Sequence, residues 1–423
     1  MITRPSSILH SVRPLTPFSH ISHHLRHHTS KTAAPQPPKG PLTGITVVSV
    51  EQAIAGPFCT RQLADLGARV IKIERPGVGD FARNYDTRVN GLSSHFIWTN
   101  RSKESLALDV KTPSDHNVLL RLLGKADVLV QNLAPGASAR LGLSHESLKH
   151  QFPGLIVCNI SGYGSDGPYR DKKAYDLLIQ SEAGLLSVTG TGRKAPVKVG
   201  ISIADICAGS YAYASILAAL LDRKETGLGC NLDISMLESM VEWMGFPMYY
   251  SFGGQDAPVP AGASHAAIYP YGPFETGDGK AVMLGIQNER EWGNFCSMVL
   301  RKPEVATDAR FASNALRSSN RDALRRVILD AFSALTAETV TRLLEEAAIA
   351  NANINDLQAV WDHPQLKARS RWTEIKTPAG VVPALFPPGM GKPGEDGFAA
   401  KMDAVPAVGE HNEAILRELG IGD

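Results

Sequence analysis

The chain has 423 residues, 43% of them hydrophobic, which is enough to build one large core or two moderate ones. Its 43 basic and 42 acidic residues nearly cancel, so the composition lacks the strong positive charge that is typical of nucleic-acid-binding proteins. Five scattered cysteines form no CxxC pair and no zinc spacing, which is typical of a reducing compartment where thiols serve as small buried residues.

The first forty residues differ in composition from the rest of the chain. They contain five basic residues and many serines, and no acidic residue occurs before Glu51. Such a segment is typical of an organelle transit peptide, whereas a secretory signal needs an unbroken apolar stretch that Pro, Ser, His and Arg interrupt here. We therefore predict a disordered transit peptide over residues 1–40 and a location in the mitochondrial matrix, with the peroxisome or cytosol as alternatives.

A histidine-rich tract lies within this segment, between His20 and His28. Such a tract binds metal only where a scaffold fixes the ligands, and the surrounding Pro and Ser supply none, so we predict no metal site. Without the five basic residues of the segment, the chain has 38 basic and 42 acidic residues, and this net negative charge disfavours nucleic acid as a partner. We find no apolar run that approaches the length of a membrane span and expect no membrane partner.

From Pro41 onward, apolar runs typical of strands alternate with helical segments. The predicted strands cover residues 45–50, 70–74, 106–110, 127–131 and 155–160. This alternation predicts an α/β fold with a doubly wound parallel sheet. Ligands of such sheets bind beyond the carboxyl ends of the strands, so the loops after these strands are candidate binding loops.

The second half of the chain begins with a long Ala-rich helix, predicted from Asp205 to about Arg223. Residues 245–275 carry Gly, Pro and Tyr with little periodicity and are predicted to form a linker and binding loop, with a candidate lid at 253–265. A strand and several helical patterns beyond them predict a smaller α+β domain. The predicted domains are a large domain over 41–244, a linker and small domain over 245–350, and a segment over 351–423 that returns to the large domain.

The loop after the first strand lacks the motifs of common nucleotide-dependent enzymes. It contains one Gly, at Gly56, where a dinucleotide site needs Gly-x-Gly-x-x-Gly. The chain also has no Walker loop and no Gly-x-Ser-x-Gly nucleophile elbow. NAD-dependent, phosphate-loop NTPase and serine-hydrolase functions therefore lose their main support.

Cations and amides follow several of the predicted strands. Arg75 follows the second strand, Lys111 the third, and Asn132 with Arg140 the fourth. Such groups suit an anionic nucleotide, although a solvated charged rim would show the same pattern. Asp205 stands in a run of small and apolar residues, and this segment alone favours a helix N-cap over a nucleophilic carboxylate.

Several short segments occur in a fixed order, and the set is specific although each is weak alone. They are Ala55-Gly-Pro57, Leu63-Ala-Asp-Leu-Gly-Ala68, Val70-Ile-Lys-Ile-Glu-Arg-Pro-Gly77, Leu108-Asp-Val-Lys111, Asn132-Leu-Ala-Pro-Gly136, Gly162-Tyr-Gly164, Ala174-Tyr-Asp176, the Asp205 segment and Thr226-Gly-Leu-Gly229. In this order they resemble the class III CoA-transferase family, which also contains the α-methylacyl-CoA racemases. The resemblance runs from about Leu42 to Met236 and continues more weakly to the C-terminus.

The resemblance implies a Rossmann-like large domain, a small domain and an interlocked homodimer, with a coenzyme A thioester as substrate and no permanently bound cofactor. It places the catalytic aspartate of the family at Asp205. The positions that contact CoA in the family are Ala55, Arg75, Leu108, Lys111, Asn132, Arg140 and Lys173. Tyr175 and Asp176 fall on positions that line the acyl site, and Gly262 and His265 lie near the glycine loop of the family.

A carboxylate suits CoA transfer because its mixed anhydride is reactive enough for the CoA thiolate to reopen. The predicted reaction therefore passes through an aspartyl anhydride and an aspartyl-CoA thioester. Racemases of the family carry His before the position of Asp176, and the phenol of Tyr175 is a poorer base for that chemistry. A transferase is thus favoured over a racemase, and the presence of Asp205 argues against a catalytically inactive CoA-binding protein.

The acceptor acid is predicted from two observations. Ile54 stands where formyl-CoA:oxalate transferases carry Gln, which disfavours oxalate. The overall likeness to transferases that use succinyl-CoA indicates a small dicarboxylic acid of the itaconate, mesaconate or glutarate class. Arg83, Arg88 and His265 are candidate partners of its distal carboxylate.

Overall fold

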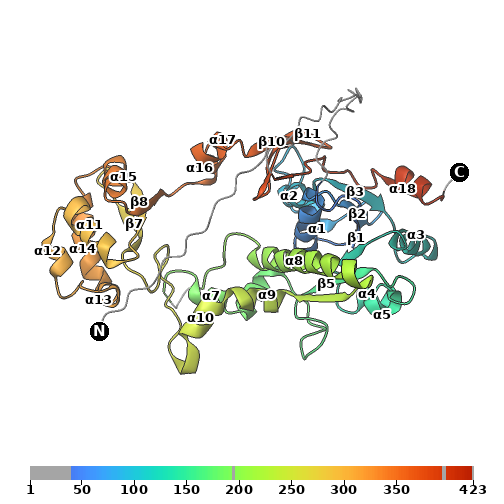
Figure 1. Ribbon diagram of the computed structural model, residues 1–423, viewed down its shortest axis with the longest axis horizontal. Coiled ribbons are helices and arrows are strands. Elements are labelled where there is room, and N and C mark those ends of the chain that lie inside the picture. The colour runs from blue at the N-terminus through green and yellow to red at the C-terminus, as the bar shows by residue number, and fades with distance from the viewer. Residues whose placement is uncertain (1–39, 193–195, 393–396, 422–423) are drawn as a thin grey trace, which may run out of the picture. The chain divides into compact units, whose positions relative to one another are not determined.

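The computed structural model describes residues 40–192, 196–392 and 397–421. The predicted transit peptide and its histidine tract lie outside these residues, apart from Gly40. Among the described residues, the largest sheet has six strands in the order β3-β2-β1-β4-β5-β6 (Figure 1). The strands are β1 Thr46–Val50, β2 Arg69–Glu74, β3 Lys103–Ala107, β4 Val128–Gln131, β5 Ile156–Ser161 and β6 Asn231–Ser235.

All neighbouring strands of this sheet run parallel. The register places Val47 of β1 beside Val70 of β2 on one side and Val128 of β4 on the other. The first three strands run outward from β1 in one direction and the next three in the opposite direction, which is the doubly wound, Rossmann-like order. The predicted α/β fold with a parallel sheet is therefore confirmed.

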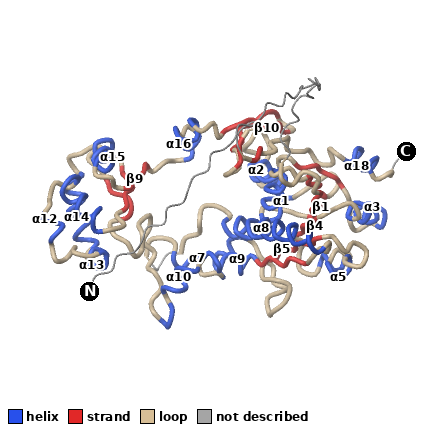
Figure 2. The backbone as a smooth tube through the Cα atoms, viewed as in Figure 1, coloured by secondary structure: helices blue, strands red, loops and turns tan. Residues whose placement is uncertain are grey.

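Helices cover both faces of the sheet (Figure 2). Side chains on successive strand residues point to opposite faces, so Val47 packs in one hydrophobic cluster and Val48 in another. The helices that contribute to the first cluster are α1 Ala55–Asp65, α6 Asp176–Glu182, α7 Leu185–Val188, α8 Ile203–Thr226 and α9 Met236–Trp243. Those that contribute to the second are α3 Pro113–Leu123, α5 His145–Leu148 and α18 Asn412–Glu418, and Leu141, which follows the short helix α4 Ala137–Arg140, packs against it as well.

Helix α8 packs against α1 through small residues. Ala204, Ala208 and Ala212 are fully buried, and a Cβ on Gly209 would lie 2.6 Å from the carbonyl oxygen of Ala55. The expectation that no run approaches membrane-spanning length is wrong, because α8 is long and apolar enough by length and composition to cross a membrane. Core helices of soluble proteins pass the same test, and α8 contributes to the first hydrophobic cluster.

A second sheet is antiparallel and has a hydrophobic cluster of its own. It contains β7 Tyr271–Glu275, β8 Ala281–Gly285 and β9 Ala350–Asn353. The helices that accompany it are α11 Glu289–Asn294, the π-helix η3 Phe295–Val299, α12 Glu304–Thr307, α13 Asn314–Ser319, α14 Arg321–Phe332 and α15 Ala337–Glu346. Its cluster runs from Tyr269 to Ile349 and shares no residue with the clusters of the parallel sheet.

The remaining described elements are short. They are η1 Phe81–Asn84, α2 Ser94–Asn100, α10 Gly245–Tyr250, η2 Phe252–Gly254, α16 Leu357–Trp361, α17 Pro364–Ala368, β10 Trp372–Thr377, β11 Gly380–Leu385, β12 Met390–Gly391 and β13 Phe398–Ala399. Helix α10 and strand β7 lie in the segment predicted as an irregular linker. The C-terminal helix α18 returns to β3, where the Oδ1 atom of Asn412 accepts a hydrogen bond of 2.8 Å from the backbone of Ala107.

One predicted strand is displaced along the chain. The prediction placed it over residues 106–110, whereas β3 begins at Lys103 and ends at Ala107. The prediction followed the apolar residues, but Lys103 and Glu104 pair with β2 as well. Lys103 is buried among other charged groups, a situation that an apolar pattern cannot reveal.

Candidate active site

A cavity of about 1100 Å³ lies at the carboxyl edge of the parallel sheet. Its walls come from the residues that follow β1, β2, β3 and β4, from the end of β5, and from the first turns of α6 and α8. This is the edge at which doubly wound sheets bind ligands. The structure therefore places a cavity where the sequence predicted the binding loops.

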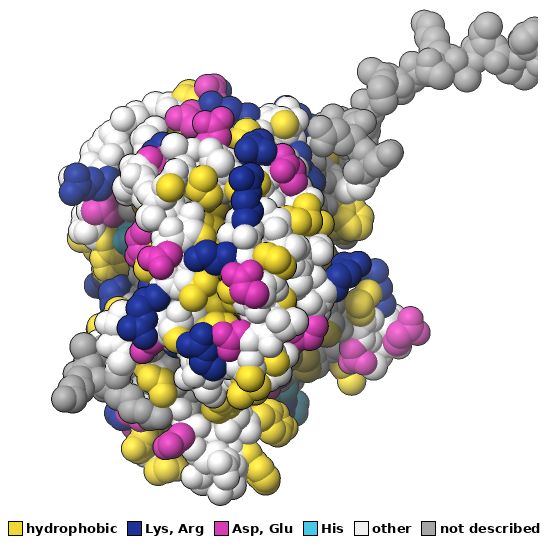
Figure 3. Space-filling model, turned by 90° about the vertical axis from the view of Figure 1, so that its left-hand side faces the viewer, with side chains coloured by type: hydrophobic (Ala, Val, Ile, Leu, Met, Phe, Trp, Pro, Cys, Tyr) yellow, Lys and Arg dark blue, Asp and Glu magenta, His cyan; other side chains and the backbone are white. Residues whose placement is uncertain are grey.

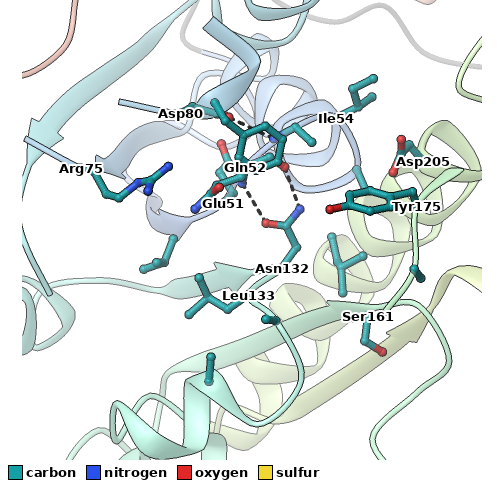
Figure 4. Close-up of a pocket in the computed structure, with 18 of the residues that line it drawn as sticks. Glu51, Gln52, Ile54, Arg75, Asp80, Asn132, Leu133, Ser161, Tyr175 and Asp205 are labelled. Atoms are coloured by element: carbon teal, nitrogen blue, oxygen red, sulfur yellow. Dashed lines mark hydrogen bonds between the residues drawn. The ribbon is translucent and has the colours of Figure 1, made fainter. Parts of the chain in front are cut away.

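Many of the predicted site residues line this cavity. They are Ala55, Arg75, Leu108, Lys111, Asn132, Lys173, Tyr175, Asp176 and Asp205. Figure 4 shows Asp205 and Tyr175 on one side of the cavity and Arg75 on the other. The structure thus brings these residues together, while their individual roles stay predictions.

Asp205 lies in the first turn of α8 and does not cap that helix. The N-cap position is Ser202, which makes no capping side-chain hydrogen bond. The Oδ1 atom of Asp176 instead accepts hydrogen bonds from the backbone N–H groups of Ala204, at 2.8 Å, and Asp205, at 3.4 Å. The N-cap interpretation of Asp205 is therefore wrong: Asp176 caps α8 from another helix and leaves the Asp205 carboxylate available for a ligand.

The electrostatic surroundings of Asp205 raise its pKa to about 7. Burial of the carboxylate is the larger cause, and the negative charge of Asp176 adds to it. A carboxylate with a raised pKa is a more basic and hence more reactive nucleophile, and a perturbed pKa beside a cavity is typical of a functional group. The position and chemistry of Asp205 both fit a catalytic carboxylate.

Gln180 supports this arrangement and was missed in the sequence. Its side chain is fully buried, and its Nε2 atom donates to Oδ2 of Asp176 at 2.7 Å. Its Oε1 atom accepts from the backbone N–H of Val199 at 3.1 Å, so Gln180 joins the segment before α8 to the capping carboxylate. The spacing of four residues between Asp176 and Gln180 on a predicted helix was the available signal.

The loop between β1 and α1 is fixed by two side chains from neighbouring loops. Asn132 and the backbone of Gln52 exchange two hydrogen bonds, both 2.8 Å long (Figure 4). Oδ1 of Asp80 accepts from the backbone N–H of Ala53, which has a φ of +62° and therefore occupies the left-handed region. Both terminal amide atoms of Asn132 are thus engaged by the protein itself, which favours a structural role beside the predicted CoA contact.

A buried ionic network lies beneath this loop. Nζ of Lys72 is 2.8 Å from Oδ2 of Asp80 and 3.6 Å from Oε1 of Glu51, and Nζ of Lys103 is 2.8 Å from the same Glu51 atom. Burial lowers the pKa of Lys103 to about 8, with Glu51 opposing and Lys72 adding to the effect. Burial alone would raise the pKa of Glu51, but Lys103 and Lys72 hold it below its usual value.

The basic residues of the cavity wall differ from those of the network. Arg75, Lys111 and Lys173 are exposed, and within the described residues none of them forms a salt bridge. Lys172 also lines the cavity but pairs with Glu182. Unpaired cations beside a cavity suit the phosphate groups of a nucleotide.

Five predicted residues do not line the cavity: Arg83, Arg88, Arg140, Gly262 and His265. The guanidinium of Arg83 donates to both carboxylate oxygens of Glu74, at 2.8 and 2.7 Å, and Arg88 and Arg140 are exposed elsewhere. Backbone Gly262 bonds to Gly190, and Nδ1 of His265 accepts two backbone hydrogen bonds. These placements favour local structural roles for Arg83 and His265 over contact with a substrate.

Comparisons with known proteins identify the family of this chain. A family model described as CoA-transferase family III matches residues 42–412. A succinyl-CoA:glutarate CoA-transferase from Homo sapiens is 31% identical over 380 residues, which are 90% of this chain and 86% of the relative. An acetyl-CoA:oxalate CoA-transferase from Acetobacter aceti is 35% identical over 337 residues, or 79% and 86% of the two chains. A crystal structure of a CAIB/BAIF family protein from Brucella suis is 32% identical, with a TM-score of 0.78 over 90% of this chain and all of its own.

Proposed function

The chain belongs to CoA-transferase family III, and we propose that it moves CoA from succinyl-CoA to a small dicarboxylic acid, with Asp205 as the nucleophile. The observation that carries this proposal is a carboxylate with a raised pKa in the wall of a cavity that also presents three unpaired cations. The carboxylate supplies the nucleophile of the reaction, and the cations supply a binding site for the phosphates of CoA.

The geometry of the cavity suggests how CoA lies in it. Arg75 follows β2 and lies on the opposite side of the cavity from Asp205 (Figure 4), and Lys111 follows β3 and also lines the cavity. A nucleotide portion bound by Arg75 and Lys111 would direct its pantetheine arm past the β1–α1 loop towards Asp205. Ala55 and Gly56 begin α1 on that path, and their lack of large side chains leaves room for the arm.

The proposed reaction begins when a carboxylate oxygen of Asp205 attacks the thioester carbonyl of succinyl-CoA. The carbon–sulfur bond breaks, the CoA thiolate leaves, and a succinyl-aspartyl anhydride forms. The thiolate then attacks the aspartyl carbonyl, which releases succinate and leaves an aspartyl-CoA thioester. The acceptor carboxylate next attacks the aspartyl-CoA thioester, which releases the CoA thiolate and forms an anhydride between the acceptor and Asp205. The thiolate then attacks the acceptor carbonyl of this anhydride, so that the product thioester forms and the Asp205 carboxylate is restored.

The choice of a dicarboxylic acceptor is supported by the relatives. The named human relative acts on glutarate and the Acetobacter aceti relative on oxalate, and both acids carry a second carboxylate. Acids of the itaconate, mesaconate or glutarate class are our proposed acceptors, and oxalate is the alternative. Ile54 lines the cavity at the position where formyl-CoA:oxalate transferases carry Gln, which favours the larger acids.

The assembly and location of the protein are further parts of this proposal. Large apolar side chains are strongly exposed on α10, η2 and α16, among them Tyr249 at 83%, Phe252 at 78% and Leu357 at 83%. Such a concentration is typical of a surface that a partner covers, and it supports the proposed homodimer. The face in Figure 3 mixes basic, acidic and apolar side chains.

The basic first forty residues support a mitochondrial location.

A panel of acceptors tests the proposed function. Purified protein is incubated with succinyl-CoA and glutarate, itaconate, mesaconate or oxalate, and mass spectrometry detects each new CoA thioester. We expect transfer to at least one of the first three acids. Transfer to oxalate alone would favour the alternative acceptor, whereas transfer to none of the four would contradict the proposed reaction.

A further inference from the structure

We propose that His95 binds the distal carboxylate of the dicarboxylic substrate. This inference rests on the proposed function, since only a dicarboxylic acid has a second carboxylate to bind. His95 is the second residue of α2, and its partly exposed side chain lines the same cavity as Asp205. His95 belongs to none of the sequence motifs described above.

One ring nitrogen of His95 is held by the protein and the other faces no protein partner. Nδ1 lies 3.3 Å from Oδ2 of Asp86. Within the described residues, Nε2 makes no hydrogen bond. When Nδ1–H donates to Asp86, Nε2 of the neutral ring is an acceptor, so binding of a carboxylate at Nε2 requires the protonated ring, in which Nε2–H is a charged donor.

Asp86 is built to remain ionised. It accepts hydrogen bonds from the backbone N–H groups of Arg88 and Ser94, both at 3.0 Å, and from the Ser94 hydroxyl at 2.7 Å. These bonds hold the pKa of Asp86 well below its usual value. An ionised Asp86 accepts the hydrogen bond from Nδ1–H and leaves Nε2 as the ring nitrogen that is open to a substrate carboxylate.

Tyr85 connects His95 with the catalytic end of the cavity. The two rings meet edge to face, with centroids 5.4 Å apart and planes at 88°. Burial, together with the charges of Asp80 and Asp205, raises the pKa of Tyr85 to about 12, so its hydroxyl stays protonated at neutral pH. Tyr85, His95 and Asp205 line the same cavity, so a substrate attached to Asp205 can extend along Tyr85 towards His95.

The other basic groups of the cavity have different partners or positions. Arg75 lies across the cavity from Asp205 (Figure 4), Lys111 follows β3 and is assigned to the phosphates of CoA in the proposed function, and Lys172 pairs with Glu182. Arg83, which we predicted for this role, donates both arms of its guanidinium to Glu74 and lies outside the cavity wall. Lys173 also lines the cavity and is assigned to the phosphates of CoA in the proposed function, so His95 is the remaining basic side chain of the wall, and its ring contacts that of Tyr85.

Paired substrates test this assignment. For glutarate, itaconate and mesaconate, kcat/KM is measured for the acid and for its monomethyl ester, with succinyl-CoA as the donor in every assay. The ester lacks the charge of the distal carboxylate. Because succinyl-CoA is the donor in both assays, any effect of the mutation on succinyl-CoA cancels in the ratio of kcat/KM for acid and ester. We expect His95→Gln to lower the acid-to-ester ratio by about tenfold or more, the usual loss for a hydrogen bond to a charged group.

Two further variants make the result specific. His95→Arg keeps a cationic donor and is expected to retain most of the preference for the free acid. His150→Gln removes an exposed histidine that does not line the cavity and should leave the ratio unchanged. Thermal unfolding of each variant identifies a loss of fold, which would lower both rates alike and leave the ratio as it was.

The outcomes separate this inference from the proposed function. A His95→Gln enzyme that keeps the wild-type ratio would overturn the role of His95 while CoA transfer to dicarboxylates stands. A wild-type enzyme that transfers CoA to none of these acids would overturn both. A ratio that falls in His95→Gln and is retained in His95→Arg would support the assignment.

Discussion

Two groups of charged residues, one beneath the β1–α1 loop and one on the cavity wall, differ in burial and pairing. Beneath the β1–α1 loop, Glu51, Lys72, Asp80 and Lys103 are buried and each contacts an opposite charge. On the cavity wall, Arg75, Lys111 and Lys173 are exposed and form no ion pair among the described residues. The same residue types thus occur in one region as a support for the backbone and in the other as groups open to a ligand.

The physical reason for this difference is the cost of removing a charge from water. A buried charge without a partner is strongly destabilising, so the network beneath the loop must be complete for the loop to keep its conformation. An exposed cation loses little without a partner and can exchange water for phosphate. Substitutions in the first region should therefore alter stability, and those on the wall should alter activity or binding.

The largest effect is expected at the wall, from Asp205→Asn. An amide cannot form the anhydride, so we expect a loss of CoA transfer of about a thousandfold or more. The unfolding midpoint in urea should remain at or above the wild-type value, because the variant removes a partly buried charge beside Asp176. Asp166→Asn, on an exposed residue outside the wall, is the matched control and should keep full activity.

The buried network is tested by Lys72→Met. The methionine side chain fills a similar volume but leaves Asp80 and Glu51 without this partner, which should lower the free energy of unfolding by about 3–5 kcal/mol. Urea denaturation followed by circular dichroism measures the change. Lys111→Met applies the same substitution to the wall and should change stability by less than about 0.5 kcal/mol. Equal changes in the free energy of unfolding for Lys72→Met and Lys111→Met would contradict the difference between the buried network and the cavity wall.

A smaller effect is expected from Lys111→Ala, measured as binding of succinyl-CoA. Loss of one charge-assisted contact with phosphate should raise KM about tenfold while kcat changes little. Because the contact is exposed, the difference between variant and wild type should shrink when the ionic strength is raised. A KM that does not change at low salt would place the phosphates of CoA elsewhere.

The last expected effect concerns the pH dependence of stability. The pKa of Asp205 is about 7 in the folded protein and its ordinary value is 3.8, so the folded state holds the proton more tightly than the unfolded state. The stabilisation is fully present below pH 3.8 and is lost as the pH rises through about 7. Urea titrations from pH 5 to 8 should therefore show wild type losing stability relative to Asp205→Asn. A difference in the free energy of unfolding between the two proteins that stays constant from pH 5 to 8 would contradict the raised pKa of Asp205.

Much of the fold could be predicted from the sequence because it depends on local patterns. The apolar runs of β1, β2, β4 and β5 and the proline that opens α3 are visible without the structure, whereas Pro57 is the third residue of α1. β3 was displaced in the prediction because Lys103 is a charged residue inside the core, compensated by Glu51 from a distant part of the sequence. Pairings of that kind depend on tertiary contacts.

Prediction of the site from the sequence is also limited by tertiary contacts. Most residues of the cavity wall were predicted, because loops at the carboxyl ends of parallel strands meet at one edge. The sequence could not show that Asp176 rather than Asp205 caps α8, since the cap crosses from one helix to another. Nor could it show that Arg83 is engaged by Glu74, or that His95 reaches the cavity while His265 does not.

The central claim, that Asp205 is the nucleophile, is tested most directly by trapping the enzyme during turnover. The protein is mixed with succinyl-CoA, quenched in acid and digested, and the peptide that contains Asp205 is analysed by mass spectrometry. We predict that this peptide carries a CoA thioester on Asp205 and that the adduct is absent from Asp205→Asn. A turning-over enzyme whose CoA adduct lies on another residue, or which forms no adduct at all, would contradict the account.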